Sequence, residues 1–246
     1  MTLTFGENFL ISERLIGATL VKRYKRFLAD VKIDGQENEL TVHCPNPGSM
    51  IGIAEAGSRI WLRPARNSAS KLPYAWVLSQ LESSFVSVDT LLANKLLALS
   101  LAEGEIPELA GYANIHKERQ FQESRFDFFL SDHANLKNCF LEVKSTTLSI
   151  ERVAMFPDAK TERGKKHLQH LIECRRQGLR AVQFFCISRS DCLEFKPAAH
   201  IDKAYADALI EAESHGVEIF AYSVSISRDD SCFNYSLSKS VPVSLR

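Results

Sequence analysis

Apolar and polar positions alternate over short stretches in the first ninety residues and recur at helical spacing only afterwards. A long run of β-branched and aromatic residues extends from Ala18 to Ile33 and breaks at Asp34-Gly35, a dipeptide that indicates a turn. The returning strand and three more are expected at 39–43, 57–62, 74–78 and 84–88. Five short strands without a strong helical pattern predict a small β-barrel.

The pattern changes after Val88. Asp89-Thr90 can cap a helix that continues to about Gly104. Helices are then expected at 161–177 and 201–215, and strands at 115–121, 125–130, 139–145, 179–187 and 217–224. The expected fold class is therefore α/β, or α+β overall. It combines an OB-like β-barrel in residues 1–88 with an α/β domain in residues 89–246, whose order of elements is that of a restriction-endonuclease-like sheet.

The chemistry of the second half centres on two neighbouring strands with acids in them. Asp127 lies in the first strand and Glu142-Val143-Lys144 in the second, so alternation places Glu142 and Lys144 on one face. Carboxylates are costly to bury unpaired, and a divalent ion, magnesium or manganese, held by Asp127 and Glu142 would remove that cost. Lys144 could then orient an attacking water or neutralise a phosphate. An acid on one strand and Glu-x-Lys on the next is the pattern of the PD-(D/E)xK metal-dependent nucleases, so residues 89–246 are expected to form a PD-(D/E)xK restriction-endonuclease-like α/β domain. The alternative interpretation is a solvated charge pair on an exposed strand.

Two groups of basic residues are candidates for nucleic-acid contact. The first group lies within the predicted first strand. Its cations alternate with aromatic rings, as on protein surfaces that bind single-stranded nucleic acid: Lys22, Arg23, Tyr24, Lys25 and Arg26. The second surrounds the helix that begins near Thr161, where Arg163 and His167 share a face as a candidate phosphate clamp and Lys160 and Lys166 lie nearby. Each group can equally be a set of solvated charges on an ordinary strand or helix.

Composition restricts the partners and the compartment. Thirty lysines and arginines balance thirty aspartates and glutamates, so any contact with DNA must come from a local cluster of positive charge. We expect no membrane span and no secretory signal. Six cysteines without a Cys-x-x-Cys pair are typical of reduced thiols in the cytoplasm. No P-loop or GxGxxG is present, which argues against a nucleotide cofactor.

From about Leu20 onward the chain resembles the sugar fermentation stimulation protein A (SfsA) family, in segments that include HCPNPGSM, FLEVKSTTL and FPDAKTERGKKHL. The resemblance implies an N-terminal OB-like domain, a nuclease-like domain, DNA binding and a suggested role in regulating sugar use, maltose in particular. The family's acids fall on Asp127 and Glu142, its lysine on Lys144, and its helix signature on Thr161, Arg163, Gly164 and His167.

Two departures from these patterns bear on activity. Pro47 stands where the family usually has a threonine, and the first helix of the second half carries no carboxylate before Glu103. Many PD-(D/E)xK enzymes take a third acid from that helix. Three hypotheses therefore stay open: a DNA-binding module, with strand type undecided; a magnesium- or manganese-dependent nuclease; and a regulator that acts through protein contacts alone. The oligomeric state is not predicted.

Overall fold

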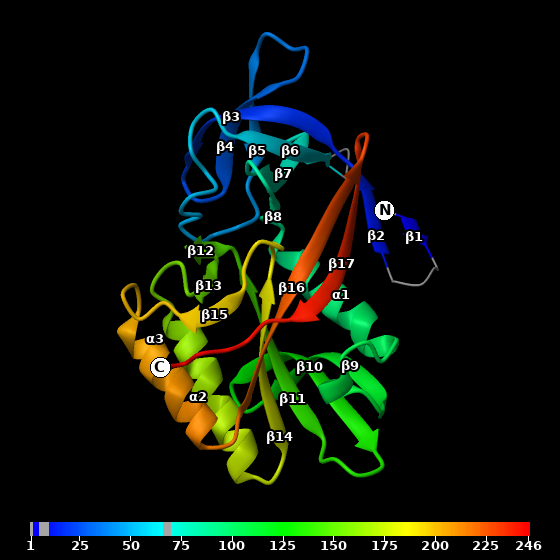
Figure 1. The fold of residues 1–246 in the computed structure, drawn as a ribbon, viewed down its shortest axis with the longest axis vertical. Helices are drawn as coiled ribbons and strands as arrows, with labels where there is room; N and C mark the ends of the chain where they lie inside the picture. Colours follow the sequence, from blue (N-terminus) through cyan, green and yellow to red (C-terminus); the bar gives the residue numbers. More distant parts are fainter. Residues whose placement is uncertain (1, 5–9, 66–69) are drawn as a thin grey trace.

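The computed structural model describes residues 2–4, 10–65 and 70–246. Two parts are stacked along the long axis: a β-barrel from the first third of the chain, and a large sheet with helices on both faces (Figure 1). The expected class, an OB-like barrel followed by an α/β domain, is confirmed.

Four antiparallel strand pairs and one parallel pair close the barrel. Its strands run in the order β5-β4-β3-β6-β7, and a parallel contact between His43 and Ala75 joins β5 to β7, while β8 extends the sheet beyond β7. The bounds are β3 Ile16–Tyr24, β4 Leu28–Ile33, β5 Glu39–His43, β6 Arg59–Pro64, β7 Tyr74–Gln80 and β8 Phe85–Ser87. Alternate side chains fill the interior, including Leu20, Val31 and Trp76, all fully buried.

The expected uninterrupted strand from Ala18 to Ile33 is wrong. The chain reverses after Tyr24, and Leu28 pairs back against that residue. Lys25 and Arg26 make the turn with φ angles of 48° and 62°. Two consecutive left-handed residues form a tight hairpin turn, which normally selects Asn and Gly. The sequence offers neither here, so the turn carried no recognisable signal.

The second part is built on an eight-stranded mixed sheet in the order β1-β2-β17-β16-β14-β11-β10-β9. Its central strands β11, β14 and β16 are parallel, and the strands outside them are antiparallel. The bounds are β1 Thr2–Thr4, β2 Leu10–Arg14, β9 Tyr112–Phe121, β10 Ser124–His133, β11 Cys139–Thr146, β14 Arg180–Ile187, β16 Glu218–Asp229 and β17 Cys232–Ser240. Every residue of β14 is buried, as its apolar sequence predicted.

Helices cover both faces of this sheet. Helix α1 (Thr90–Ala102) packs on one face, and α2 (Glu162–Arg176) and α3 (Lys203–Ser214) pack on the other (Figure 1). The predicted caps are present: Asp89 accepts a hydrogen bond from Leu91 N–H, and Thr161 accepts one from Gly164 N–H. A short helix, Pro107–Leu109, follows α1, and a small sheet lies beside α3, with strands β12 Leu148–Ile150, β13 Val153–Phe156 and β15 Glu194–Pro197.

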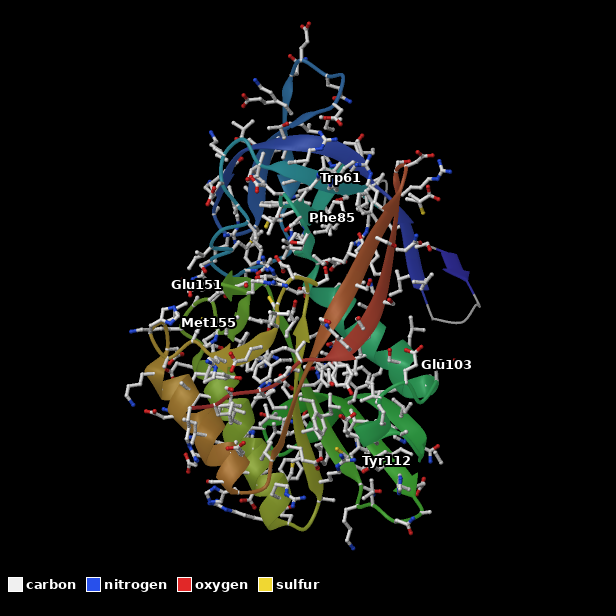
Figure 2. All side chains as sticks on the ribbon, in the orientation of Figure 1. Trp61, Phe85, Glu103, Tyr112, Glu151 and Met155 are labelled. Carbon is white, nitrogen blue, oxygen red and sulfur yellow. The ribbon has the colours of Figure 1, made fainter. Side chains whose placement is uncertain are left out.

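The barrel has an apolar core of its own, and Trp61, Val77 and Leu78 of the barrel also pack against the large sheet. The long β16–β17 hairpin reaches up to the barrel, where the Phe233 ring lies 4.8 Å from Trp61 and 5.3 Å from Phe85, centroid to centroid. Figure 2 shows Trp61 and Phe85 at this junction. Strand β2 pairs with β17, so residues 10–14 add to the large sheet. The division at residues 88 and 89 stays a prediction. In the described ranges, no helix is long and apolar enough to cross a membrane.

Candidate functional site

The two predicted acids meet where the β10–β11 ladder ends. The last paired residues are Phe128 and Leu141, and the same register places Asp127 opposite Glu142. At this point the Val143 N–H donates to the Asp127 carboxylate, 2.8 Å away, instead of to a backbone carbonyl. The interrupted ladder therefore turns Asp127 toward the neighbouring acid.

Asp127 is held from both of its oxygens. Besides Val143, the Asn94 side-chain amide of α1 donates to Oδ1 at 2.7 Å. Burial raises the pKa of Asp127, and the nearby negative charge of Glu142 raises it further, against the smaller opposing effect of its hydrogen bonds. Two carboxylates thus lie close together in a poorly solvated place.

Glu142 is buried, with only 4% of its surface exposed. Its Oε1 accepts from Lys144 Nζ at 2.6 Å and is hydrogen-bonded to His167 Nδ1, whereas Oε2 has no partner among the described residues. Burial would raise the pKa of Glu142, but the His167 hydrogen bond and the Lys144 charge outweigh it, so the pKa is lowered. Glu142 is therefore a carboxylate with one free, desolvated oxygen.

Arg163, His167 and Glu142 form a chain of hydrogen bonds with His167 in the middle. Arg163 Nε lies 3.4 Å from His167 Nε2, and guanidinium nitrogens only donate, so Nε2 is the acceptor. The ring proton then sits on Nδ1 and points at Glu142. The predicted pair does share a face of α2, but the His167 ring is buried against the edge of Phe126 and holds the acid in place.

These residues fit a divalent cation in part. Asp127 and Glu142 repel each other, and Glu142 Oε2 is a hard oxygen donor that no described group satisfies. A cation between them would relieve both costs. In the part of the chain that the structure describes, no three His, Cys, Asp or Glu side chains converge on one point. Helix α1 contributes the amide of Asn94 next to Asp127, and not a third carboxylate.

A cleft of about 410 Å³ opens beside this site, between the barrel and the large sheet. Lys144 and Ser145 line one wall, and the loop 46–48 of the barrel lines the other, with Asn94 and Lys160 at its border. Two hydrogen bonds bridge the walls: Ser49 Oγ donates to the Asp158 carbonyl at 2.5 Å, and Met50 N–H donates to its carboxylate at 3.2 Å.

Sequence reasoning missed the bridging role of Asp158 and the contact of Asn94 with Asp127. Asp158 lies in a loop, and no local pattern indicates its contact with residues more than a hundred positions away. Asn94 lies in a leucine-rich helix, where a single amide side chain is not a recognisable signal of a site. Pro47, the unusual loop residue, lines the cleft.

The predicted basic residues of the barrel separate into two roles. Arg23 donates to the carbonyls of Asn46 and Gly48, each at 2.8 Å, and so fixes the shape of the cleft loop. Lys22 pairs with Asp30 at 3.3 Å, and the same acid accepts from Tyr24 Oη at 3.0 Å.

The remaining predicted cations are more open to solvent. Lys25 and Arg26 extend from the exposed β3–β4 turn, and the Arg26 side chain reaches the border of the cleft. Lys160 lines the cleft as well, while Lys166, near the start of α2, pairs with Glu123 at 2.6 Å. The structure thus brings Arg26, Lys160 and Lys144 around one cleft and leaves Lys166 outside it.

The fold and the site define a two-part protein, an OB barrel joined to an α/β domain of the restriction-endonuclease class. Two family models match the chain: the SfsA N-terminal OB domain over residues 21–88, and the sugar fermentation stimulation protein RE domain over residues 91–230. The chain belongs to the sugar fermentation stimulation protein family, as its resemblance predicted.

A solved structure of the same family agrees with this assignment. The structure of Pyrococcus furiosus SfsA in complex with Ca²⁺ has 25% sequence identity, a TM-score of 0.85, and 99% of each chain covered. A repair endonuclease from Pyrococcus abyssi matches at 12% identity with a TM-score of 0.31, covering 85% of each chain. The second score is too low to carry any argument about the fold or the site.

Proposed function

We propose that this protein binds nucleic acid and holds a divalent cation between Asp127 and Glu142. The observation that carries the proposal is a pair of neighbouring carboxylates, Asp127 half-buried and Glu142 buried, with Glu142 Oε2 left without a partner among the described residues. The Ca²⁺ complex of the P. furiosus relative supports a hard divalent cation, and magnesium or manganese are the ions we expect here.

The cleft supports a sugar-phosphate backbone as the ligand. Three basic residues, Arg26, Lys144 and Lys160, line the cleft together with one acid, Asp158, so the lining carries an excess of positive charge in a chain of zero net charge. Lysine and arginine side chains in such a cleft bind phosphates and not base edges, so we expect salt-sensitive binding with little sequence preference.

Hydrolysis of a phosphodiester is the second candidate function. A divalent cation supplies electrophilic activation of a phosphate oxygen when it is bound. Lys144 Nζ, 2.6 Å from Glu142 and on the wall of the cleft, is placed to stabilise negative charge on a bound phosphate. His167 keeps Glu142 oriented. With two carboxylates and no third, we expect hydrolysis to be slow compared with binding.

The family name connects these proteins with sugar fermentation, so we place the nucleic-acid binding in the control of sugar use. The cytoplasm is the compartment we propose, because all six cysteines are unpaired and five are buried.

Isothermal titration with manganese tests the cation site. Wild type should bind one ion, and Asp127→Asn and Glu142→Gln should each abolish binding while the thermal unfolding curve shows an intact fold. Asp207→Asn is the matched control, since that exposed acid on α3 pairs only with Lys203. Equal manganese affinity in wild type and both site variants would refute the assignment. Lys144→Ala should keep nucleic-acid retention and remove any cleavage.

A further inference from the structure

Phe27 is a large aromatic side chain that the fold leaves 46% exposed. It follows the β3–β4 turn, and its ring stacks on that of His43, with centroids 6.4 Å apart and planes 20° from parallel. The Cys44 N–H donates to the Phe27 carbonyl at 2.8 Å, and Leu28 pairs with His43 in the sheet. Backbone bonds on both strands therefore hold the two rings in a fixed, outward-facing arrangement.

Cations stand directly beside this ring pair. Lys25 and Arg26 form the preceding turn, and neither side chain makes an ion pair with any other described residue. The turn is braced from within, because Arg23 donates to the Arg26 carbonyl at 2.9 Å. Unpaired cations next to a flat aromatic surface are the combination that binds single strands, since rings stack on bases while cations follow phosphates.

The ring pair is continuous with the cleft. Arg26 is adjacent to Phe27 in the chain, and its side chain lines the cleft that Lys160 and Lys144 also line. A strand could therefore stack a base on Phe27 and carry its next phosphates past Arg26 toward the two acids.

The cleft favours one strand over two. Hydrogen bonds from Ser49 and Met50 to Asp158 join its walls, and its volume of about 410 Å³ suits a short stretch of one backbone. A base can stack on a protein ring only where it has left the duplex stack, and leaving costs free energy in a paired strand.

We propose that Phe27 and His43 form a base-stacking platform, and that the nucleic acid bound by this protein is single-stranded. This inference rests on the proposed function and names the class of ligand for that site. The strand would cross the β3–β4 turn and enter the cleft beside Lys144.

Fluorescence anisotropy tests the platform, with chelator present so that the probe stays intact. The probes are a labelled oligothymidine of about twelve nucleotides and a blunt duplex of the same length. Wild type should bind the single strand more tightly. Phe27→Ala should weaken that binding about five-fold or more and leave duplex binding unchanged, because stacking on one ring contributes that much. Phe27→Trp, which keeps a flat ring, should retain the affinity.

Two further variants separate stacking from charge. Leu136→Ala is the matched control, since this side chain is 43% exposed in the distant β10–β11 loop and should not affect binding. Arg26→Gln should flatten the slope of log affinity against log salt, whereas Phe27→Ala should leave the slope unchanged. Equal affinity of wild type for both probes, or full affinity in Phe27→Ala, would overturn the platform and leave the proposed function standing. Failure to retain either probe would overturn both.

Discussion

At the scale of single residues, the candidate site depends on how Glu142 divides its contacts. Lys144 and His167 both contact Oε1, and Oε2 has no partner among the described residues. The two donors come from different elements, β11 and α2, and both hold Oε1 in place. The residue therefore keeps a charged, oriented oxygen in a buried place, at the cost of its desolvation.

Asn94 offers a test of the two-carboxylate site. We expect Asn94→Asp to bind manganese roughly tenfold more tightly than wild type, because a third negative charge beside Asp127 raises the ligand charge. Without metal the variant should unfold at a lower temperature, since three carboxylates then repel one another. Titration calorimetry measures the first effect, and thermal unfolding with and without manganese measures the second.

Asn94→Ala serves as the control for that substitution. It removes the donor to Asp127 and adds no charge, so it should lower stability by about 1–3 kcal/mol without tightening metal binding. Manganese affinity in Asn94→Asp no better than in wild type would show that α1 does not face the ion.

Part of this site followed from the sequence. Alternation along a strand was sufficient to pair Glu142 with Lys144, and it requires no knowledge of the rest of the fold. Arg23 was different: it was grouped with the phosphate-binding cations, yet it donates to the carbonyls of Asn46 and Gly48. The left-handed turn at Lys25 and Arg26 reverses the chain just after Arg23, and the sequence has no Asn or Gly at these positions to indicate the turn.

At the scale of elements, two loops meet across the cleft: the barrel loop 46–50 and the loop that carries Asp158. They approach so closely that a methyl group added at Gly48 would overlap the Asp158 carboxylate. Glycine is required at this position for its size, because the loop packs directly on the acid.

Gly48→Ala should therefore destabilise the protein by about 1–3 kcal/mol, the usual cost of overpacking. The double variant Gly48→Ala, Asp158→Ala should lose less than the sum of the two single variants, since each single change disturbs the same contact. Chemical denaturation of the four proteins gives the coupling free energy. Strict additivity would show that the loops do not touch in solution.

The helices and central strands of the large sheet lie close to their predicted bounds, and so do the barrel strands β5 to β8. Helix α2 begins at its expected Thr161 cap and ends before Gly178, which has a φ of +77°, because capping residues act locally. Strands β2 and β17 were not assigned from sequence. Their pairing joins residues more than two hundred positions apart, and a local sequence pattern does not indicate so distant a partner.

At the scale of the whole molecule, Arg63 links the barrel to the rest. Its guanidinium lies on β6 and contacts Glu13 of β2 and Asp89 at the start of α1, with Nη2 2.8 Å from the Asp89 carboxylate and 3.0 Å from that of Glu13. Both acids are buried, at 9% and 3% exposure. One cation on β6 thus neutralises two acids, one on β2 and one at the start of α1.

Arg63→Ala should cost about 3–5 kcal/mol of stability, because it leaves two buried carboxylates without their partner. Urea unfolding measures the loss. Arg59→Ala is the matched control, since that arginine is also on β6 but its partner, Asp34, is exposed; it should cost about 1 kcal/mol or less. Equal losses in the two variants would show that the Arg63 cluster is solvated.

The pairing of β2 with β17 makes the barrel an insertion between two pieces of one sheet. During synthesis, residues 16–88 can close into a barrel before residues 232–240, which pair with β2, have been made. At ordinary rates of synthesis, the time between these two events is on the order of ten seconds. For that time the edge of β2 that β17 will cover is open to other chains. The slow, non-local step of folding is therefore the completion of the large sheet, and the barrel is already in place when it occurs.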